Sequence, residues 1–249
     1  MSAASEDHQT PVYLGAGDLE KGRPAHIERT VTPGGHPVDY SQPAIPAQHR
    51  KFGNPLPAGL LSFATGFWVV GLYTLNVRGV VHPHAVFPLL NMFLGITQTL
   101  VGWFEMFIGN TFSATIFICY GGFIWSYSML FLPGFAVTEA YMVDGVLTDE
   151  FNQAIGLFMV VWTIVTFFFC LAALRSSVAV LGTLSFTGIA FMCMAIQNLT
   201  GSDHARVAAG AFQLIAGSFG YWAALSGYWT PDVTYAFIRA PPIMLSKAE

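Results

Sequence analysis

Few side chains in this chain could carry out chemistry, and the long apolar runs contain a single carboxylate. Glu105 is the only acidic residue inside the long apolar runs, and no lysine or arginine lies deep in any of them. A carboxylate at the centre of a bilayer costs roughly 2.5–3.5 kcal/mol on insertion scales, so such residues usually have a function. Glu105, however, stands about one turn before Gly109-Asn110-Thr111, at the edge of its run. It can act on a solute or a proton, or it can reach interfacial water and cap the next helix.

A second polar candidate, Gln98, lies two turns before Glu105 in the same run. Its carboxamide can either hydrogen-bond to a neighbouring helix or line a pore. The runs contain no metal-ligand pair, no Ser–Lys pair and no paired carboxylates, and the three cysteines lack the spacing of a metal or redox site. We therefore expect neither an enzyme nor a bound metal or cofactor.

Three helices carry bulky or polar side chains at a similar depth. Each of these residues follows the expected start of its helix by about nine or ten positions, and the three helices start on the same side of the membrane. At 1.5 Å per residue the side chains sit roughly 14–15 Å deep, near the bilayer midplane. Such a layer can form a constriction that gates by size and dewetting, although ordinary helix packing uses the same residue types. The residues are Phe63 and Tyr120 and, on the fifth helix, Phe186 and Thr187.

The elements that must position these residues begin at one fixed point, Gly53-Asn54-Pro55-Leu56-Pro57. Proline lacks an N–H and clashes inside a helix, but it fits the first turn, where the N–H is unpaired anyway. Asn54 is a natural N-cap, since its side-chain oxygen can accept a hydrogen bond from that turn. Residues 56–77 are apolar and uncharged. A transmembrane helix that begins here is therefore predicted.

The composition indicates an all-α polytopic membrane protein. Hydrophobic residues make up 54% of the chain and charged residues 10%, whereas an average soluble domain has about 25% charged residues. Six apolar runs have the length of roughly 20 residues that crosses a 30 Å hydrocarbon core. The last run carries small residues such as Gly210 and Gly217, which let helix backbones approach closely. We predict six transmembrane helices, at residues 56–77, 84–108, 112–133, 151–174, 178–198 and 205–229.

The chain divides into three expected parts. Residues 1–52 are rich in Pro, Gly, His, Ser and Thr without an apolar period, so we expect a disordered cytosolic tail. Residues 53–238 form the six-helix transmembrane domain, and residues 239–249 form a short cytosolic tail. With both termini inside, the acidic loop at residues 134–150 faces outward. The basic residues then favour the inside, with Arg50, Lys51, Arg175, Arg239 and Lys247 against Arg78 and Arg206 outside.

Three segments of the chain carry a family resemblance. GNPLPAGLLSF at residues 53–63 resembles the NPAPLGL signature of the acetate uptake transporter family, the YaaH-like acetate/succinate–proton symporters of bacteria and fungi. GNTFSATIFICYGGF at residues 109–123 resembles the GNTFG…SYG segment of that family, and MAIQNLTG at residues 194–201 resembles its AIGN…G segment. The likeness covers roughly residues 52–238, and the long polar tail is similar to that of the fungal members.

The resemblance implies a six-helix subunit in a hexamer, in which each subunit has its own pathway for small monocarboxylates. The hydrophobic constriction of the family, carried over by position, falls on Phe63, Tyr120 and a third residue on the fifth helix. That residue is usually leucine; an ungapped match puts Thr187 there, and a one-residue shift puts Phe186. The signature departs from the family at Leu56 and Ala58, where alanine and leucine are expected.

The resemblance implies transport of acetate and similar short monocarboxylates, with acetate crossing as the anion together with a proton or as acetic acid. The partners are then a small monocarboxylate, protons, the lipid bilayer of the plasma membrane and further copies of the chain. No nucleic-acid partner is expected at a net charge of −4. The helix starts at Asn54, Asn110 and Thr111 can offer free N–H groups to a carboxylate. Two alternatives stay open: a channel for ammonia or another small neutral solute, and a nutrient-sensing membrane protein that does not transport.

Overall fold

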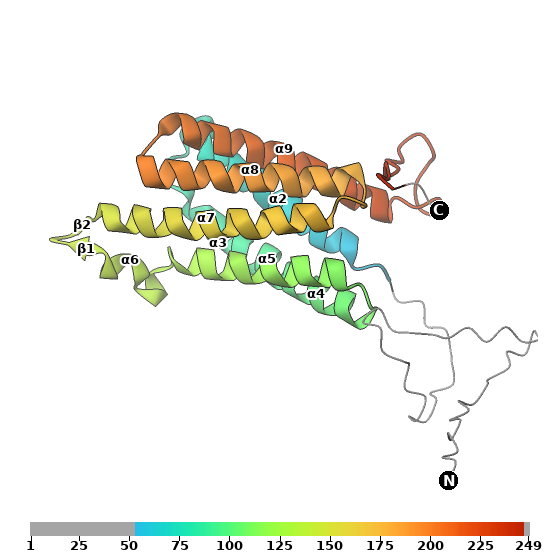
Figure 1. Cartoon of the computed structure of the whole chain (residues 1–249), viewed down its shortest axis with the longest axis horizontal. Helices are drawn as coiled ribbons and strands as arrows, with labels where there is room; N and C mark the ends of the chain where they lie inside the picture. Colours follow the sequence, from blue (N-terminus) through green and yellow to red (C-terminus); the bar gives the residue numbers. More distant parts are fainter. Residues whose placement is uncertain (1–52, 247–249) are drawn as a thin grey trace, which may run out of the picture. The chain divides into compact units, whose positions relative to one another are not determined.

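The structure, a computed structural model, describes residues 53–246, so the tail predicted at residues 1–52 lies outside the described part (Figure 1). The described domain is built from six long helical segments. Five are single helices, and the second is a continuous helical stretch of four elements. Each segment overlaps one predicted apolar run, and the ends of the segment and of the run differ by at most four residues. They are α2 (Leu56–Thr74), the stretch η2–α3–η3–α4 (Pro83–Ala85, Val86–Pro88, Leu89–Gly95, Ile96–Phe107), α5 (Thr111–Met129), α7 (Asp149–Ala172), α8 (Val178–Thr200) and α9 (Asp203–Tyr228).

Four of these segments are long enough and apolar enough to cross a membrane on length and composition alone. They are α2, the stretch Pro83–Phe107, α7 and α8. The other two long helices, α5 and α9, are of similar length but contain more serine. Their lower hydropathy has a structural reason, because small residues on these two helices meet the backbones of their neighbours.

The helix starts follow the predicted capping. Asn54 Oδ1 accepts a hydrogen bond from Leu56 N–H at 3.1 Å, with Pro55 and Pro57 in the first turn. Asn110 Oδ1 accepts from Ser113 N–H at 3.3 Å at the start of α5. Each bond satisfies an amide that the helix itself leaves free.

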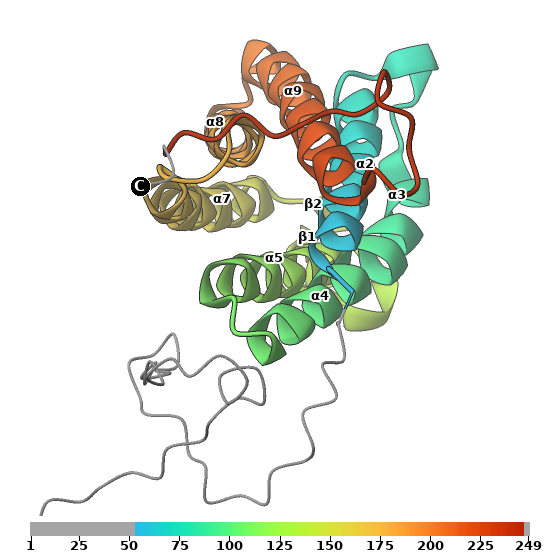
Figure 2. The same cartoon turned by 90° about the vertical axis from the view of Figure 1, so that its right-hand side faces the viewer.

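The six segments form a ring when viewed along their length (Figure 2). In order around the ring they are α2, α9, α8, α7, α5 and α4. The α2–α9 contact depends on glycine, as the small residues of the last run predicted. A Cβ on Gly71 would stand 3.1 Å from the carbonyl oxygen of Gly210, and a Cβ on Gly217 would stand 3.0 Å from that of Ala64. The two backbones can therefore approach closely only because these side chains are absent.

The second helical stretch contains a π-helical segment, η3 (Leu89–Gly95), that the apolar pattern did not predict. It follows Pro88, which has no N–H for the regular ladder. Asn91 anchors the segment: its Nδ2 donates to Phe87 O at 2.8 Å, and its Oδ1 accepts from the Ser128 hydroxyl at 2.7 Å. The irregular backbone is thus tied to α5.

The predicted acidic loop at residues 134–150 contains short elements of regular structure. It contains η4 (Pro133–Phe135), α6 (Val137–Ala140) and an antiparallel hairpin of β1 (Met142–Val143) and β2 (Val146–Leu147). Both turn residues have positive φ, 52° at Asp144 and 77° at Gly145. This is the backbone that an Asp-Gly hairpin turn requires. The Val-Asp-Gly-Val sequence is a local signal for this hairpin, which was not predicted.

The segment that ends the described chain returns to the linker between α7 and α8. Val178 N–H donates to Ile243 O at 2.8 Å, and Leu245 N–H donates to Ser176 O at 3.0 Å. Ser177 and Met244 form an isolated antiparallel bridge. The start of α8 is therefore fixed by the last residues that the structure describes. These residues belong to the part predicted as a short tail.

Candidate functional site

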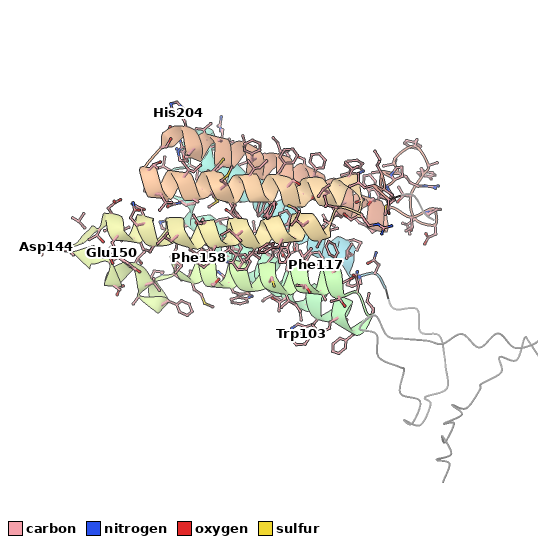
Figure 3. All side chains as sticks on the ribbon, viewed as in Figure 1. Trp103, Phe117, Asp144, Glu150, Phe158 and His204 are labelled. Atoms are coloured by element: carbon pink, nitrogen blue, oxygen red, sulfur yellow. The ribbon has the colours of Figure 1, made fainter. Side chains whose placement is uncertain are left out.

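The helical domain has two distinct ends (Figure 1). Helices α2, α5 and α8 begin at one end, where residues 53 and 246 also lie, and we call it the tail end. The β1–β2 hairpin lies at the other end, the hairpin end. Asp144, Glu150 and His204 all lie at the hairpin end (Figure 3). Each end contains a cavity.

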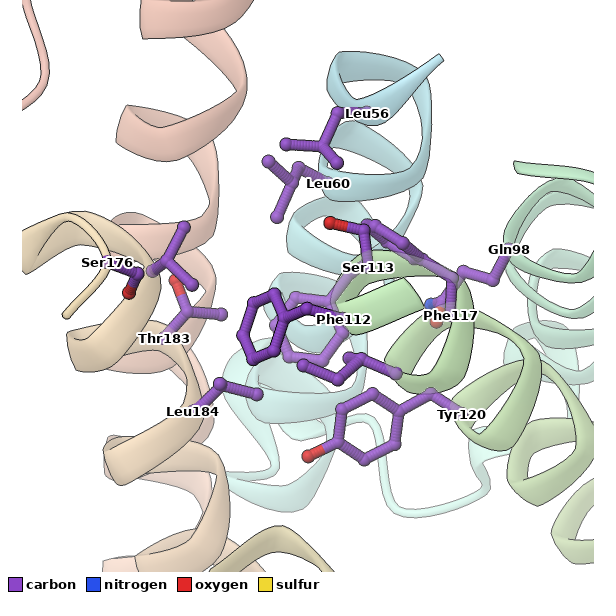
Figure 4. Close-up of a pocket in the computed structure, with 13 residues that line it drawn as sticks. Leu56, Leu60, Gln98, Phe112, Ser113, Phe117, Tyr120, Ser176, Thr183 and Leu184 are labelled. Carbon is purple, nitrogen blue, oxygen red and sulfur yellow. The ribbon is translucent and has the colours of Figure 1, made fainter. Parts of the chain in front are cut away.

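The tail-side cavity has a volume of about 200 Å³ and is mostly apolar. Its walls come from α2, α4, α5 and α8, which meet there from different sides (Figure 4). Five polar side chains are among those that line it. The lining residues are Leu56, Leu60, Phe63, Gln98, Phe112, Ser113, Ile116, Phe117, Tyr120, Ser176, Val180, Thr183 and Leu184.

Gln98 is the polar group of this cavity that the protein leaves unpaired. Its side chain is fully buried, and neither Oε1 nor Nε2 has a hydrogen-bond partner among residues 53–246. A buried amide without a partner costs about 1–3 kcal/mol. The carboxamide points from α4 towards the cavity (Figure 4), so a bound solute could supply the missing bonds. Of the two interpretations of Gln98, lining a cavity fits this geometry and hydrogen bonding to another helix does not.

Phe63 and Tyr120 close the inner end of the tail-side cavity. The side chains are 5% and 4% exposed, and the ring centroids are 6.2 Å apart. Their contact places the two rings at a similar level of the helical domain. The Tyr120 hydroxyl donates to Thr166 Oγ1 of α7 at 3.0 Å. In this arrangement the Tyr120 hydroxyl donates its proton to a protein group and not to a solute in the cavity.

The two residues expected on the fifth helix have different surroundings. Phe186 faces α9, where its ring lies 6.1 Å from Phe212 and 5.4 Å from Phe219. Thr187 is fully buried, and its hydroxyl donates to Thr183 O at 2.7 Å. Neither lines the tail-side cavity.

Two other α8 residues lie on the same face as Thr187, about one turn to either side of it. Leu184 lines the tail-side cavity, and the Phe191 ring lies 6.5 Å from Tyr120. Positions 184, 187 and 191 follow one another along one face of α8. Counting residues from the helix start fixes the depth only to within a turn, and it does not fix which neighbours the side chain meets.

Five aromatic side chains form a layer across the domain. We call Phe63, Phe67, Tyr120, Phe123 and Phe191 the aromatic layer. The Phe63 and Phe67 rings stack at 4.2 Å, Phe67 lies 6.1 Å from Phe191, and Phe123 lies 4.9 Å from Phe191. All five side chains are less than 9% exposed. Apart from Phe63 and Tyr120, whose depth the sequence indicated, these residues were not predicted.

The hairpin-side cavity lies beyond this layer and has a volume of about 430 Å³. On α2, α5 and α8 the order from tail end to hairpin end is a residue of the first cavity, a residue of the aromatic layer, and a residue of the second cavity. The second cavity is lined by Val70, Tyr73, Thr74, Asn76, Val81, Pro83, Val86, Phe87, Leu90, Tyr127, Phe131, Leu147, Phe151, Asn152, Ile155, Met194, Gln197, Asn198 and Arg206. The aromatic layer therefore separates two cavities that approach it from opposite ends.

The polar residues predicted at the helix ends form a short hydrogen-bonded chain. Asn110 Nδ2 donates to Glu105 Oε2 and also to Ser113 Oγ, which lies at 2.9 Å. Ser113 lines the tail-side cavity, whereas Glu105 and Asn110 do not. Glu105 is 1% exposed, and its second oxygen has no partner among the residues described. Glu105 thus contacts the cap of α5, as one of its two interpretations required.

The remaining helix-end residues are outside the cavities. Asn54 and Thr111 are exposed, and neither lines the tail-side cavity. The Asn54 side chain holds Leu56 N–H, so that amide is not free for a solute. The expected anion contacts at these positions have no support in the cavity geometry.

Residues 38–247 match the GPR1/FUN34/yaaH family. The chain belongs to this family. Acetate permease A of Emericella nidulans is 33% identical over 67% of this chain and 58% of its own length. Ammonia transport outward protein 2 of Saccharomyces cerevisiae is 26% identical over 68% of this chain and 59% of its own length. The chain thus spans less than two thirds of either relative.

Among solved structures, the bacterial acetate channel SatP has the same fold as this GPR1/FUN34/yaaH family member. The TM-score is 0.62 at 24% identity, over 71% of this chain and 92% of the channel. The resemblance that the three sequence segments indicated is therefore confirmed. The relatives of this family whose names state an activity are permeases, transporters and channels rather than enzymes.

Proposed function

We propose that this chain transports acetate and similar short monocarboxylates across a membrane, through a pathway inside each subunit. The observation that carries the proposal is the pair of cavities that approach one aromatic layer from opposite ends. Such an arrangement suits a solute that is small enough to pass when the aromatic side chains move apart. The family relatives named as acetate permease and acetate transporter agree with this solute.

The tail-side cavity matches a short carboxylic acid in its chemistry. The Gln98 carboxamide and the Ser113 hydroxyl can donate hydrogen bonds to carboxylate oxygens. Apolar side chains such as Leu60 and Ile116 can contact the methyl group. Phe63 and Tyr120, at the inner end, then exclude acids with longer chains. Occupation of this cavity would satisfy the Gln98 amide that the protein leaves unpaired.

The proposal has the proton travel on the solute. None of the residues that line the tail-side cavity is an aspartate, glutamate, histidine, lysine or arginine. A carboxylate that enters such a cavity loses the stabilisation of water without gaining a charge partner, which favours the neutral acid. Glu105 is joined to the cavity only through Asn110 and Ser113. It serves as a positioning residue in this scheme.

The arrangement in the membrane belongs to the same proposal. All six long segments cross the bilayer, with the tail end in the cytosol and the hairpin end outside. In this orientation Arg78 and Arg206 are the basic residues on the outside. More basic residues lie on the inside, as the positive-inside rule requires: Arg50, Lys51, Arg175, Arg239 and Lys247. We place the protein in the plasma membrane, as a homo-oligomer. The family resemblance implies that this oligomer is a hexamer.

The test is uptake of radiolabelled acetate into vesicles that contain the purified full chain, with and without an inward proton gradient. Empty vesicles are the control, because acetic acid also crosses lipid unaided. We expect uptake above that control, faster with the gradient, and competed by propionate. Uptake equal to that of empty vesicles under both conditions would overturn the proposal. A nutrient sensor without transport predicts that second outcome.

A second candidate, a channel for ammonia, is favoured by the same uncharged cavity. Gln98 Oε1 could accept a hydrogen bond from ammonia, and no side chain that lines the tail-side cavity repels or attracts ions by its charge. Ammonia transport outward protein 2 is one of the relatives. Ammonia flux into the same vesicles, followed by an internal pH dye, separates the two. Acetate uptake without ammonia flux supports the first function, and the reverse supports the second.

A further inference from the structure

The hairpin-side cavity contains one charged side chain among the residues that line it, Arg206. Arg206 lies in the first turn of α9, and its side chain is 25% exposed. Its guanidinium is fixed in two directions: Nε donates to Asp203 Oδ1 at 2.7 Å, and Nη1 donates to the carbonyl oxygen of Thr74 at the end of α2. A guanidinium has five N–H donors, so most of its donors are left for another acceptor.

The partner of Arg206 does not cancel its charge inside the cavity. Asp203 is 77% exposed and is not among the residues that line the cavity. Its carboxylate is therefore screened by solvent, whereas the guanidinium borders the cavity. The pair acts as a dipole with its positive end towards the cavity.

Carboxamide side chains of α7 and α8 line the same cavity. Asn152 of α7 and Gln197 and Asn198 of α8 line it together with Arg206. Asn198 Nδ2 donates to Met194 O at 2.8 Å, but no acceptor for Asn152 Nδ2 or Gln197 Nε2 is found among residues 53–246. A planar guanidinium and neutral amide donors are the groups that bind carboxylates in water-exposed sites.

We propose that the hairpin-side cavity binds the carboxylate anion of the solute, with Arg206 as its charge partner and Asn152 and Gln197 as hydrogen-bond donors. This inference rests on the proposed function, since it takes a monocarboxylate as the solute. The two cavities then differ in what they hold: a charged acid at the hairpin end and a neutral one at the tail end. Between the two cavities the carboxylate takes up a proton from the outer solution, so that it passes the aromatic layer as the neutral acid.

Acidic groups near the hairpin-side cavity could instead make it attract cations. Asp149 lines a smaller neighbouring pocket that shares Asn152, Gln197 and Asn198 with the hairpin-side cavity. Glu150 follows it at the start of α7. If these carboxylates set the potential, the cavity would attract cations such as ammonium instead. The sign of the local potential is therefore the quantity to measure.

The first experiment measures that potential without any transport. A single cysteine at Asn152→Cys is modified with two methanethiosulfonate reagents, one an anionic sulfonate and one a cationic trimethylammonium. The chain without this cysteine gives the background from Cys119, Cys170 and Cys193. We expect the anionic reagent to be favoured, and Arg206→Gln to lower the ratio of the anionic to the cationic rate about fivefold. Arg78→Gln is the matched control, because Arg78 has the same charge but does not line the cavity.

The second experiment asks whether the charge serves the solute. In the vesicle assay, Arg206→Gln should raise the KM for acetate about fivefold, while uptake at saturating acetate stays near that of the unmodified chain. Arg206→Lys keeps the charge and should restore most of the affinity. Uptake of acetamide, which has the shape of acetate without its charge, should not change. A merely structural role in holding α9 to α2 would lower all of these rates together.

The outcomes separate this inference from the function on which it rests. A reagent ratio that Arg206→Gln leaves unchanged, or that Arg78→Gln lowers equally, would overturn the anion site. A lowered ratio in a chain that takes up no acetate would keep an anion-binding cavity and remove the acetate function. Equal loss of acetamide and acetate uptake would assign Arg206 to structure alone.

Discussion

Tyr120 on α5 donates a hydrogen bond to Thr166 on α7, at 3.0 Å between two fully or almost fully buried side chains. This bond joins the two helices at the depth of the aromatic layer, where Phe123 of α5 also lies 4.7 Å from Trp162 of α7. The position of the Tyr120 ring across the tail-side cavity therefore depends on α7 as well as on α5. A change in α7 can reach the layer without touching the cavity.

The first prediction concerns this bond. Tyr120→Phe and Thr166→Val should each lower the thermal stability of the purified chain, by about 0.6–1 kcal/mol, the range for hydrogen bonds between membrane helices. The double variant should cost little more than either single one, because both remove the same bond. Differential scanning of unfolding in detergent measures this. Additive losses would show that the two side chains act separately.

The second prediction concerns the size of the solute. Tyr120→Ala removes a large ring from the inner end of the tail-side cavity, so acetate uptake should rise or longer acids such as butyrate should enter. Competition of labelled acetate uptake by acids of increasing chain length measures the change. Unchanged selectivity and rate would exclude Tyr120 from the constriction.

The fifth helix supplies the control for this experiment. Leu184→Ala widens the same cavity and should shift selectivity in the same direction. Phe186→Leu alters a side chain that faces Phe212 and Phe219 of α9, so it should leave selectivity unchanged. A selectivity change in Phe186→Leu alone would place the constriction at Phe186, the residue that the one-residue shift of the family match gives.

Local features of the fold could be predicted from the sequence, whereas contacts between helices could not. Helix ends were predictable because proline, asparagine and serine act locally, as at Asn54 and Asn110. Depth was predictable for Phe63 and Tyr120, since a helix rises by a fixed length per residue. The facing of Phe186 was not, because which neighbour a side chain meets depends on helix tilt and on all the other helices. The same limit hid Phe67, Phe123 and Phe191, which look like ordinary apolar residues in the sequence.

Two other features were missed for different reasons. The π-helical segment at Leu89–Gly95 depends on a bond between Asn91 and Ser128, which no local pattern contains. The β-hairpin, in contrast, had a local signal in Asp144-Gly145. It was overlooked because the strands are only two residues long, too short for an alternating pattern.

The third prediction uses two adjacent glycines of α5. A Cβ on Gly121 would stand 2.4 Å from Thr99 Oγ1 and 3.0 Å from Thr99 N, whereas nothing lies within 4 Å of a Cβ on Gly122. Gly121→Ala should therefore destabilise the chain by about 1–3 kcal/mol, because α4 and α5 must separate. Gly122→Ala should stabilise it by up to about 1 kcal/mol through helix propensity. Equal effects of the two variants in thermal unfolding would mean that α4 and α5 do not meet here.

The last prediction sets function against stability at Gln98. Gln98→Leu replaces an unpaired buried carboxamide by an apolar side chain of similar size, so the chain should gain about 1 kcal/mol or remain unchanged in stability. The same change removes one of the two hydrogen-bond donors proposed for the tail-side cavity, so the KM for acetate should rise. A residue that lowers the stability of the protein is expected at a position where it binds a solute.

Gln213 provides the matched control for that experiment. It is 2% exposed, its Oε1 is also unpaired within the described part, and its Nε2 reaches only the sulfur of Met194, at 3.2 Å. Gln213 does not line the tail-side cavity. Gln213→Leu should change the unfolding temperature in the same direction as Gln98→Leu and leave the KM for acetate as it was. If both variants raise the KM equally, the effect comes from buried polarity in general. A rise in Gln98→Leu alone assigns the solute contact to Gln98.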